Sequence, residues 1–94
     1  MITEIATISI APGQEENFEA AMRHGGIAHL SACPGVRNVQ FGRGVEDPAK
    51  FAFVVEWDSM EAHEQARGTD AFAAFRAAMG AMTIGGAMEH FALS

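Results

Sequence analysis

The polar side chains that could act on a small molecule are His63, Arg76 and Asn38. The ordinary pKa of histidine lies close to neutral pH, so we expect His63 to transfer protons as a general base. The guanidinium group of Arg76 could bind a substrate oxyanion, and the amide of Asn38 could orient a carbonyl group or dioxygen. These residue types suit the deprotonation of a substrate and the stabilisation of its anion.

Three further side chains are candidates for substrate binding. Trp57 offers a flat indole for stacking on a planar aromatic ring, with its N–H as a polar group. His90 could point into a cavity from the last expected strand, and Phe72 lies on an apolar helical stripe that could line this cavity. The residue types predict a small aromatic or apolar molecule as the ligand.

Each candidate also has a structural interpretation, which the sequence leaves open. His63 could be a half-buried helical residue bonded to a carbonyl group, and Trp57 could be an ordinary core residue. Arg76 could pair with an acidic side chain such as Glu56 or Glu89. Asn38 and the other histidines could likewise have purely structural roles.

The histidine spacing does not predict a metal site. His24 and His29 lie in one expected helix, His63 is isolated, and His90 follows Glu89. A zinc or iron site would therefore need ligands that only the fold brings together. No glycine-rich phosphate loop follows an expected strand either, so we expect no metal and no cofactor.

Composition narrows the class of protein. The chain has 94 residues and a formal net charge of −6. Its six basic residues are scattered singly, which argues against nucleic acid or an anionic membrane as a partner. No run reaches the roughly 18 to 20 apolar residues of a membrane span, and a signal-peptide pattern is lacking, so we expect a single cytoplasmic domain. The one cysteine, Cys33, is expected to be an inert packed thiol.

A small sheet with its helices must position the candidate residues. The strongest strand is Phe51–Asp58, whose two alternating faces both carry apolar residues, as a central strand requires. Gly25-Gly26 interrupts the first helix, where we expect a kink or a second contact surface. Val36 and Phe41 would lie on opposite faces under strict alternation, so we expect a bulge in the second strand. Other strands are expected at 2–10, 36–43 and 87–93, and helices at 14–32, 58–68 and 71–82.

This order of elements predicts an α+β fold. Strand, helix, strand, strand, helix and strand form the ferredoxin-like βαββαβ arrangement, a four-stranded antiparallel sheet with both helices on one face. The helices of so short a chain can cover only one face of the sheet. We therefore expect a homodimer that forms through the open sheet face.

Several segments resemble the antibiotic biosynthesis monooxygenase (ABM) domain family, whose members are dimeric α/β barrels. The resemblance covers nearly the whole chain and specifies the fold better than the chemistry. The matching segments are Ala11-Pro-Gly13, Cys33-Pro-Gly35, Glu46-Asp-Pro48, Val55-Glu-Trp57, Met60-Glu-Ala-His63, Ala71-Phe-Ala-Ala-Phe75 and Met88-Glu-His90.

The resemblance implies two kinds of activity. Cofactor-independent monooxygenases of the family act on polycyclic phenols and usually combine an asparagine, a tryptophan, an arginine and a tyrosine. Asn38, Trp57 and Arg76 match three of these, whereas the chain has no tyrosine. Haem-degrading members use a histidine on the helix after the third strand, near the position where this chain has Arg76, so haem degradation is disfavoured.

The leading hypothesis is a cofactor-independent monooxygenase that acts on a small or polycyclic phenol or hydroquinone. His63 would be the base, Arg76 or Asn38 would stabilise the anion, and Trp57 would form a wall of the cavity. Two alternatives use the same cavity: a non-catalytic binding protein for an apolar metabolite, and an isomerase or cyclase.

Overall fold

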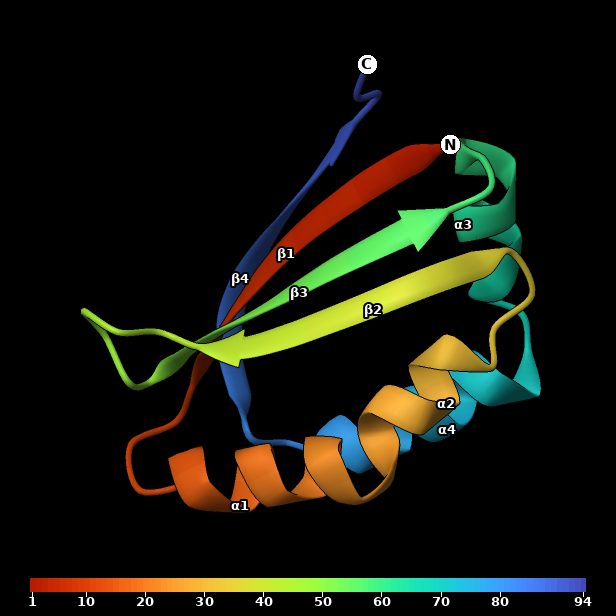
Figure 1. Cartoon of the computed structure of the whole chain (residues 1–94). Helices are drawn as coiled ribbons and strands as arrows, with labels where there is room; N and C mark the ends of the chain where they lie inside the picture. Colours follow the sequence, from red (N-terminus) through yellow and green to blue (C-terminus); the bar gives the residue numbers. More distant parts are fainter.

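Four antiparallel strands form one sheet in the computed structural model, which describes residues 1–94 (Figure 1). Their spatial order is β2-β3-β1-β4, and every neighbouring pair is antiparallel. The strand bounds are β1 Ile2–Ile10, β2 Val36–Arg43, β3 Lys50–Trp57 and β4 Thr83–Phe91.

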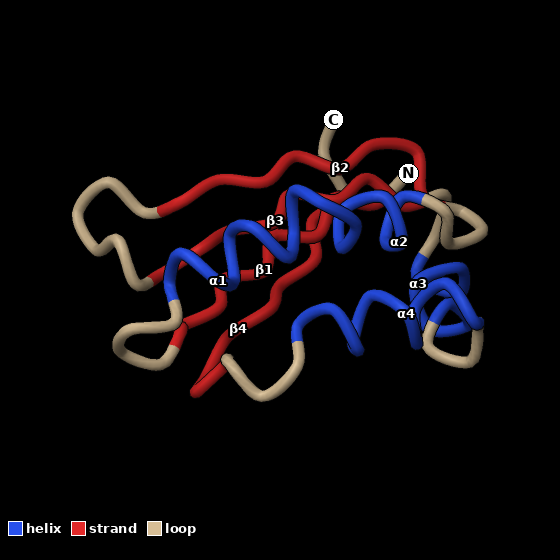
Figure 2. Tube along the Cα trace, turned by 90° about the horizontal axis from the view of Figure 1, so that it is seen from below, coloured by secondary structure: helices blue, strands red, loops and turns tan.

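The helices all lie on one side of this sheet (Figures 1 and 2), which confirms the predicted βαββαβ fold. Ser59 and Thr69 begin the two helices after β3, because their side chains accept hydrogen bonds from the backbone N–H groups of Ala62 and Phe72. The helix bounds are α1 Glu15–Ala21, the π-helical segment η1 Met22–Gly26, α2 Ile27–Ser31, α3 Met60–Ala66 and α4 Asp70–Met79.

The strand β3 lies inside the sheet, as predicted from its composition. Its inward side chains are at most 2% exposed, because the helices cover them: these are Phe51, Phe53, Val55 and Trp57. The opposite face carries Ala52, Val54 and Glu56, which are half-buried. Contacts among aromatic rings join the sheet to the helices; the ring centroids of Phe18 and Phe51 are 5.0 Å apart, and those of Phe53 and Phe75 are 5.6 Å apart.

Two local irregularities occur where the sequence predicts them. The first helix changes to π-helical geometry over η1, which ends at Gly26. The pairing of β2 with β3 shifts register between Val36 and Asn38, so Val36 and Phe41 both pack against the core. The bulge thus keeps the apolar residues of β2 on the helix side.

The predicted boundaries near the C-terminus are wrong. The last helix ends at Met79 rather than Met82, because Gly80 adopts a positive φ of 57° that stops it. The last strand then begins at Thr83 rather than Ala87 and runs through Gly85 and Gly86. The glycine pair is therefore part of β4 and does not end the helical region.

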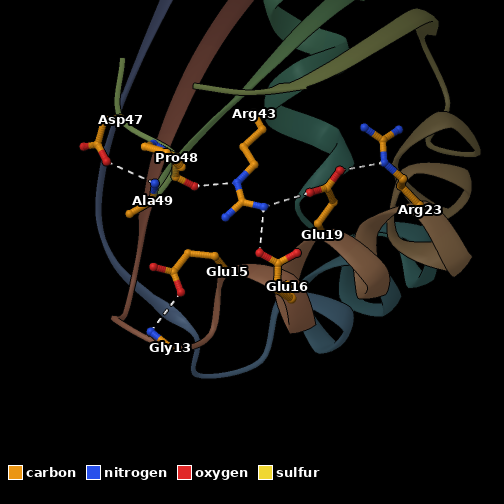
Figure 3. Close-up of polar contacts among 9 residues, drawn as sticks. All are labelled: Gly13, Glu15, Glu16, Glu19, Arg23, Arg43, Asp47, Pro48 and Ala49. Carbon is orange, nitrogen blue, oxygen red and sulfur yellow. Dashed lines mark hydrogen bonds and ion pairs between the residues drawn. The ribbon is translucent and has the colours of Figure 1, made fainter. Parts of the chain in front are cut away.

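An arginine on the edge strand ties the β2–β3 hairpin to α1 (Figure 3). Arg43 donates from Nη1 to the carboxylates of Glu16 and Glu19 at 2.9 and 3.3 Å, and from Nε to the carbonyl oxygen of Pro48 at 2.7 Å. Glu19 also accepts a hydrogen bond from Arg23 at 3.1 Å. These contacts fix the side of the molecule that carries α1.

No helix in the structure combines the length and the apolar character that a membrane span requires.

Candidate functional site

A cavity of about 410 Å³ lies between the sheet and the helices. Eleven of its 17 lining residues are hydrophobic, so the space is mainly apolar. Its floor comes from β1, β3 and β4, and its walls from α2, α3 and α4. Both the volume and the lining are typical of a site for a small organic molecule.

Three side chains from distant parts of the sequence meet beside this cavity. Glu4 and His63 line it, whereas His90, which was expected to point into it, contacts Glu4 without lining the cavity. Glu4 of β1 is the register partner of His90 on β4. His63 reaches the same point from α3, which lies by the end of the sheet where β1 begins and β3 ends (Figure 1). The Oε1 atom of Glu4 is 3.3 Å from Nδ1 of His63 and 3.7 Å from Nε2 of His90. The rings of His63 and His90 have centroids 4.4 Å apart. These three residues are called the Glu4 cluster below.

The indole of Trp57 holds the carboxylate of this cluster in place. Its Nε1–H donates to Oε1 of Glu4 at 2.8 Å, and both residues are buried. A hydrogen bond to a charged acceptor is stronger than one between neutral groups. The Trp57 ring also contacts His63 edge-on, with centroids 5.1 Å apart. Trp57 lines the cavity, but it is 1% exposed. Its indole N–H therefore bonds the Glu4 carboxylate and not a molecule in the cavity.

Burial lowers the pKa of His63 below its ordinary value, because the charged imidazolium is poorly solvated there. The nearby Glu4 carboxylate acts in the opposite direction, whereas His90 and Arg67 add to the lowering. His63 is therefore held mainly in its neutral form near pH 7. A neutral imidazole has a lone pair with which it can accept a proton.

Two buried ring nitrogens of the Glu4 cluster lack a hydrogen-bond partner. They are Nδ1 of His63 and Nε2 of His90. Both lie close to the Glu4 carboxylate, but neither has the alignment of a hydrogen bond. Since Nδ1 of His63 faces Glu4, Nε2 is the nitrogen of this ring that is left for a molecule in the cavity.

Arginine side chains supply positive charge at the cavity wall. Arg76 lines the cavity from α4 and lies over the ring of Phe72, with Cζ 5.0 Å from the ring centroid. It makes none of the ion pairs in the structure, so the expected alternative of a pair with Glu56 or Glu89 does not occur. Arg67, at the C-terminal end of α3, lines the same cavity. It was not among the candidates predicted from the sequence.

The structure places Asn38 away from the cavity. Asn38 is exposed on β2 and is the register partner of Glu56, whose side chain lies on the open face of the sheet. The bulge before it moves Val36 to the helix side and leaves the asparagine outside. Phe72, by contrast, lines the cavity as expected.

Sequence reasoning missed Glu4, although a signal for it was present. Glu4 shares the inward register of β1 with Ile2, Ala6 and Ile8, which pair with buried positions of β3. A carboxylate in this register must be buried, and a buried carboxylate needs partners. Glu89, although adjacent to His90 in the sequence, is not its partner, because successive residues of a strand point to opposite faces.

The remaining titratable candidates lie outside the site. His24 and His29 are exposed. Cys33 is buried, and burial raises the pKa of its thiol, which fits the expected inert role. The titratable side chains at the cavity are therefore those of the Glu4 cluster and the two arginines.

Comparisons with known proteins agree with this fold. The family model described as antibiotic biosynthesis monooxygenase matches residues 1–78. A crystal structure of a candidate antibiotic biosynthesis monooxygenase from Bordetella bronchiseptica is 26% identical, with a TM-score of 0.86 over 99% of this chain and 96% of that chain. A Pseudomonas aeruginosa protein, also 26% identical, gives a TM-score of 0.81 over 99% of this chain and 94% of that chain.

A more distant structure has a described chemistry. SnoaB of Streptomyces nogalater, a cofactor-independent oxygenase crystallised as an asparagine-to-alanine mutant, is 16% identical and has a TM-score of 0.77 over 98% of this chain and 91% of that chain. At this identity it shows the fold alone. No match was found among curated proteins. Because the family model covers most of the sequence, the chain belongs to the antibiotic biosynthesis monooxygenase domain family.

Proposed function

We propose that this protein is a cofactor-independent monooxygenase for a small or polycyclic aromatic substrate of the phenol or hydroquinone type. The observation that carries the proposal is the position of His63, a buried and mainly neutral histidine at the polar end of an apolar cavity of about 410 Å³. Such a cavity can hold an aromatic ring against apolar walls and place the base beside a hydroxyl group.

The first step is proton transfer from the substrate to Nε2 of His63. The Glu4 carboxylate, 3.3 Å from Nδ1, stabilises the imidazolium that forms. The chain contains no tyrosine, so no phenolic side chain shares this role. Arg76 and Arg67 at the cavity wall favour the substrate anion by their charge.

The bound anion then reduces dioxygen directly. The substrate carbanion gives one electron to dioxygen, and the two radicals combine to form a carbon–oxygen bond. The resulting peroxide takes up a proton, loses water and leaves a carbonyl group. A ring C–H of the phenol thus becomes C=O, which gives a quinone. The ring hydrogen and the hydroxyl hydrogen leave with one oxygen atom as water, the other oxygen atom enters the product, and all four electrons come from the substrate. His63 returns the proton that it accepted.

The proposal includes a homodimer that forms through the open face of the sheet. Its support is the position of Ile5 and Phe91, which are 41% and 40% exposed and lie with Val54 on the face that no helix covers. A second copy would cover these side chains. Such a dimer matches the dimeric α/β barrels that the family resemblance implies.

One alternative has a specific observation in its favour. Trp57 is already bonded to Glu4, and most of the cavity lining is apolar, as in a protein that only binds an apolar metabolite. An isomerase or cyclase would use the same base without oxygen. Only the monooxygenase consumes dioxygen in proportion to substrate.

The test is dioxygen uptake with a panel of anthrones, naphthols and hydroquinones. We expect uptake above the spontaneous rate for at least one of them, and a loss of about 100-fold or more in His63→Ala, since general-base catalysis contributes about 10² to 10⁴-fold. His24→Ala, which changes an exposed histidine, is the matched control. Substrate conversion without dioxygen uptake would favour the isomerase, and binding without conversion would favour the binding protein.

A further inference from the structure

The Glu4 cluster has an unusual feature that a proton acceptor alone does not require. Two histidine nitrogens and one carboxylate oxygen, from three different elements, lie within 4.8 Å of one another. His63 is 6% exposed, and its Nδ1 atom faces the cluster without a hydrogen-bond partner. Nε2 of His90 is buried and unpartnered as well. A buried polar atom left unpaired costs about 1 to 3 kcal/mol, so a ligand that pairs these atoms would be favoured.

The spacing of these atoms suits a metal ion. Zinc bonds to nitrogen and oxygen of about 2.0 to 2.2 Å place ligands of a tetrahedron roughly 3.3 to 3.6 Å apart. The Glu4 oxygen is 3.3 Å from the His63 nitrogen and 3.7 Å from the His90 nitrogen. The two histidine nitrogens lie within 4.8 Å of each other, so rotation of the imidazole rings toward one another would bring all three atoms to bonding distance of one ion.

The surroundings also resemble those of a metal centre. The indole N–H of Trp57 donates to the carboxylate oxygen at 2.8 Å, as the second layer of residues around a metal commonly does. Glu4 and His90 are adjacent in the sheet, and the backbone N–H of His63 bonds the carbonyl oxygen of Ser59 at the start of α3. Three ligands on rigid elements leave a fourth position, which the neighbouring cavity can supply.

We propose that Glu4, His63 and His90 bind one divalent transition-metal ion, such as Zn²⁺ or Co²⁺, with a fourth position open to the cavity. The ion would bond Nδ1 of His63, and the remaining ring nitrogen would then carry the proton and donate rather than accept. Metal binding therefore inhibits the base. This last consequence rests on the proposed function, whereas metal binding itself does not.

The test begins with protein stripped by a chelator and titrated with Co²⁺. We expect one ion per chain and the intense visible absorption of four-coordinate cobalt. The isosteric variant Glu4→Gln and the variant His90→Asn should each weaken binding by at least tenfold. The control His24→Ala, at an exposed position, should leave binding unchanged.

A second measurement needs no variant and so does not depend on folding of the mutants. In NMR spectra of the histidine rings, Co²⁺ should broaden the signals of His63 and His90 before those of the exposed His24 and His29. Broadening of the exposed pair first, or no binding at 100-fold excess of Co²⁺ over protein, would overturn the proposal.

Activity separates the two proposals. If metal-free protein turns over substrate and Zn²⁺ stops it at one equivalent, both hold. If metal binds but metal-free protein is inactive with every substrate, the metal site stands and the proposed function fails. If turnover occurs and no metal binds to the cluster, the metal site alone is wrong.

Discussion

Replacing Glu4 by glutamine should separate catalysis from folding. Glutamine has nearly the same shape as glutamate and keeps a carbonyl oxygen that can accept the 2.8 Å hydrogen bond from Trp57. It removes the negative charge that lies 3.3 Å from Nδ1 of His63. The imidazolium that forms during proton transfer then has no counter-charge in a buried site.

The expected magnitudes differ for the two properties. A hydrogen bond to a charged group contributes about 1.5 to 3 kcal/mol and a neutral one about 0.5 to 1.5 kcal/mol, so the weakened bond costs about 1 kcal/mol. Glu4 is only 8% exposed, so its negative charge is costly to bury, and removal of this charge offsets the loss. We expect the melting temperature to change by at most about 4 to 8 °C. The turnover number should fall, by up to the roughly 10² to 10⁴-fold that general-base catalysis contributes, because the imidazolium of His63 loses its counter-charge.

The assay compares Glu4→Gln with Glu89→Gln, a substitution at the neighbouring strand position whose side chain lies on the open face. Steady-state dioxygen uptake and thermal unfolding are measured on both variants. We expect a lower kcat with little change of KM for the first variant, and wild-type values for the second. Turnover of Glu4→Gln within threefold of wild type would refute the role of the carboxylate.

Three further predictions concern the fold, the dimer and the thiol. Gly86→Ala should destabilise the protein by about 1 to 3 kcal/mol in urea unfolding, because the added Cβ would lie 2.7 Å from the carbonyl oxygen of Thr7. The control is Gly85→Ala, whose Cβ meets no atom within 4 Å. Equal effects of the two substitutions would contradict this packing. Ile5→Lys should convert a sedimenting dimer to a monomer, and a wild-type monomer at micromolar concentration would exclude the dimer. Since burial raises the pKa of the Cys33 thiol, it should react with a disulfide reagent at pH 8 only as fast as the protein unfolds; immediate reaction would show an accessible thiolate.

The fold could be predicted because its signals are local. The inward alternation of Phe51–Asp58 marks a buried strand, and Thr69 is a helix N-cap that accepts the bond of the Phe72 N–H. The kink at Gly25-Gly26 follows from low helix propensity. The predicted C-terminal boundary is wrong because a glycine pair is typical of the end of a helix, whereas Gly86 lies in β4, where only a residue without a side chain fits against β1.

The site could be predicted only in part, because its geometry is not local. His63, Trp57 and Phe72 lie at the cavity as their residue types suggested. The partner of His63 is Glu4, which only the register of β1 with β3 and β4 brings to the same point. Asn38 lies outside the cavity, because it alternates with Val39 and Phe41, which pair with the buried Val55 and Phe53 of β3.

The central claim is that the cavity performs oxygen chemistry through His63 without a bound cofactor. The most direct measurement is ¹⁸O₂ incorporation by chelator-treated protein in a single turnover with the best aromatic substrate of the panel. We predict one ¹⁸O atom in each product molecule and one in water, at a rate that His63→Ala reduces at least 100-fold. Product oxygen derived from solvent, or formation that begins only after a metal or flavin is added, would contradict it.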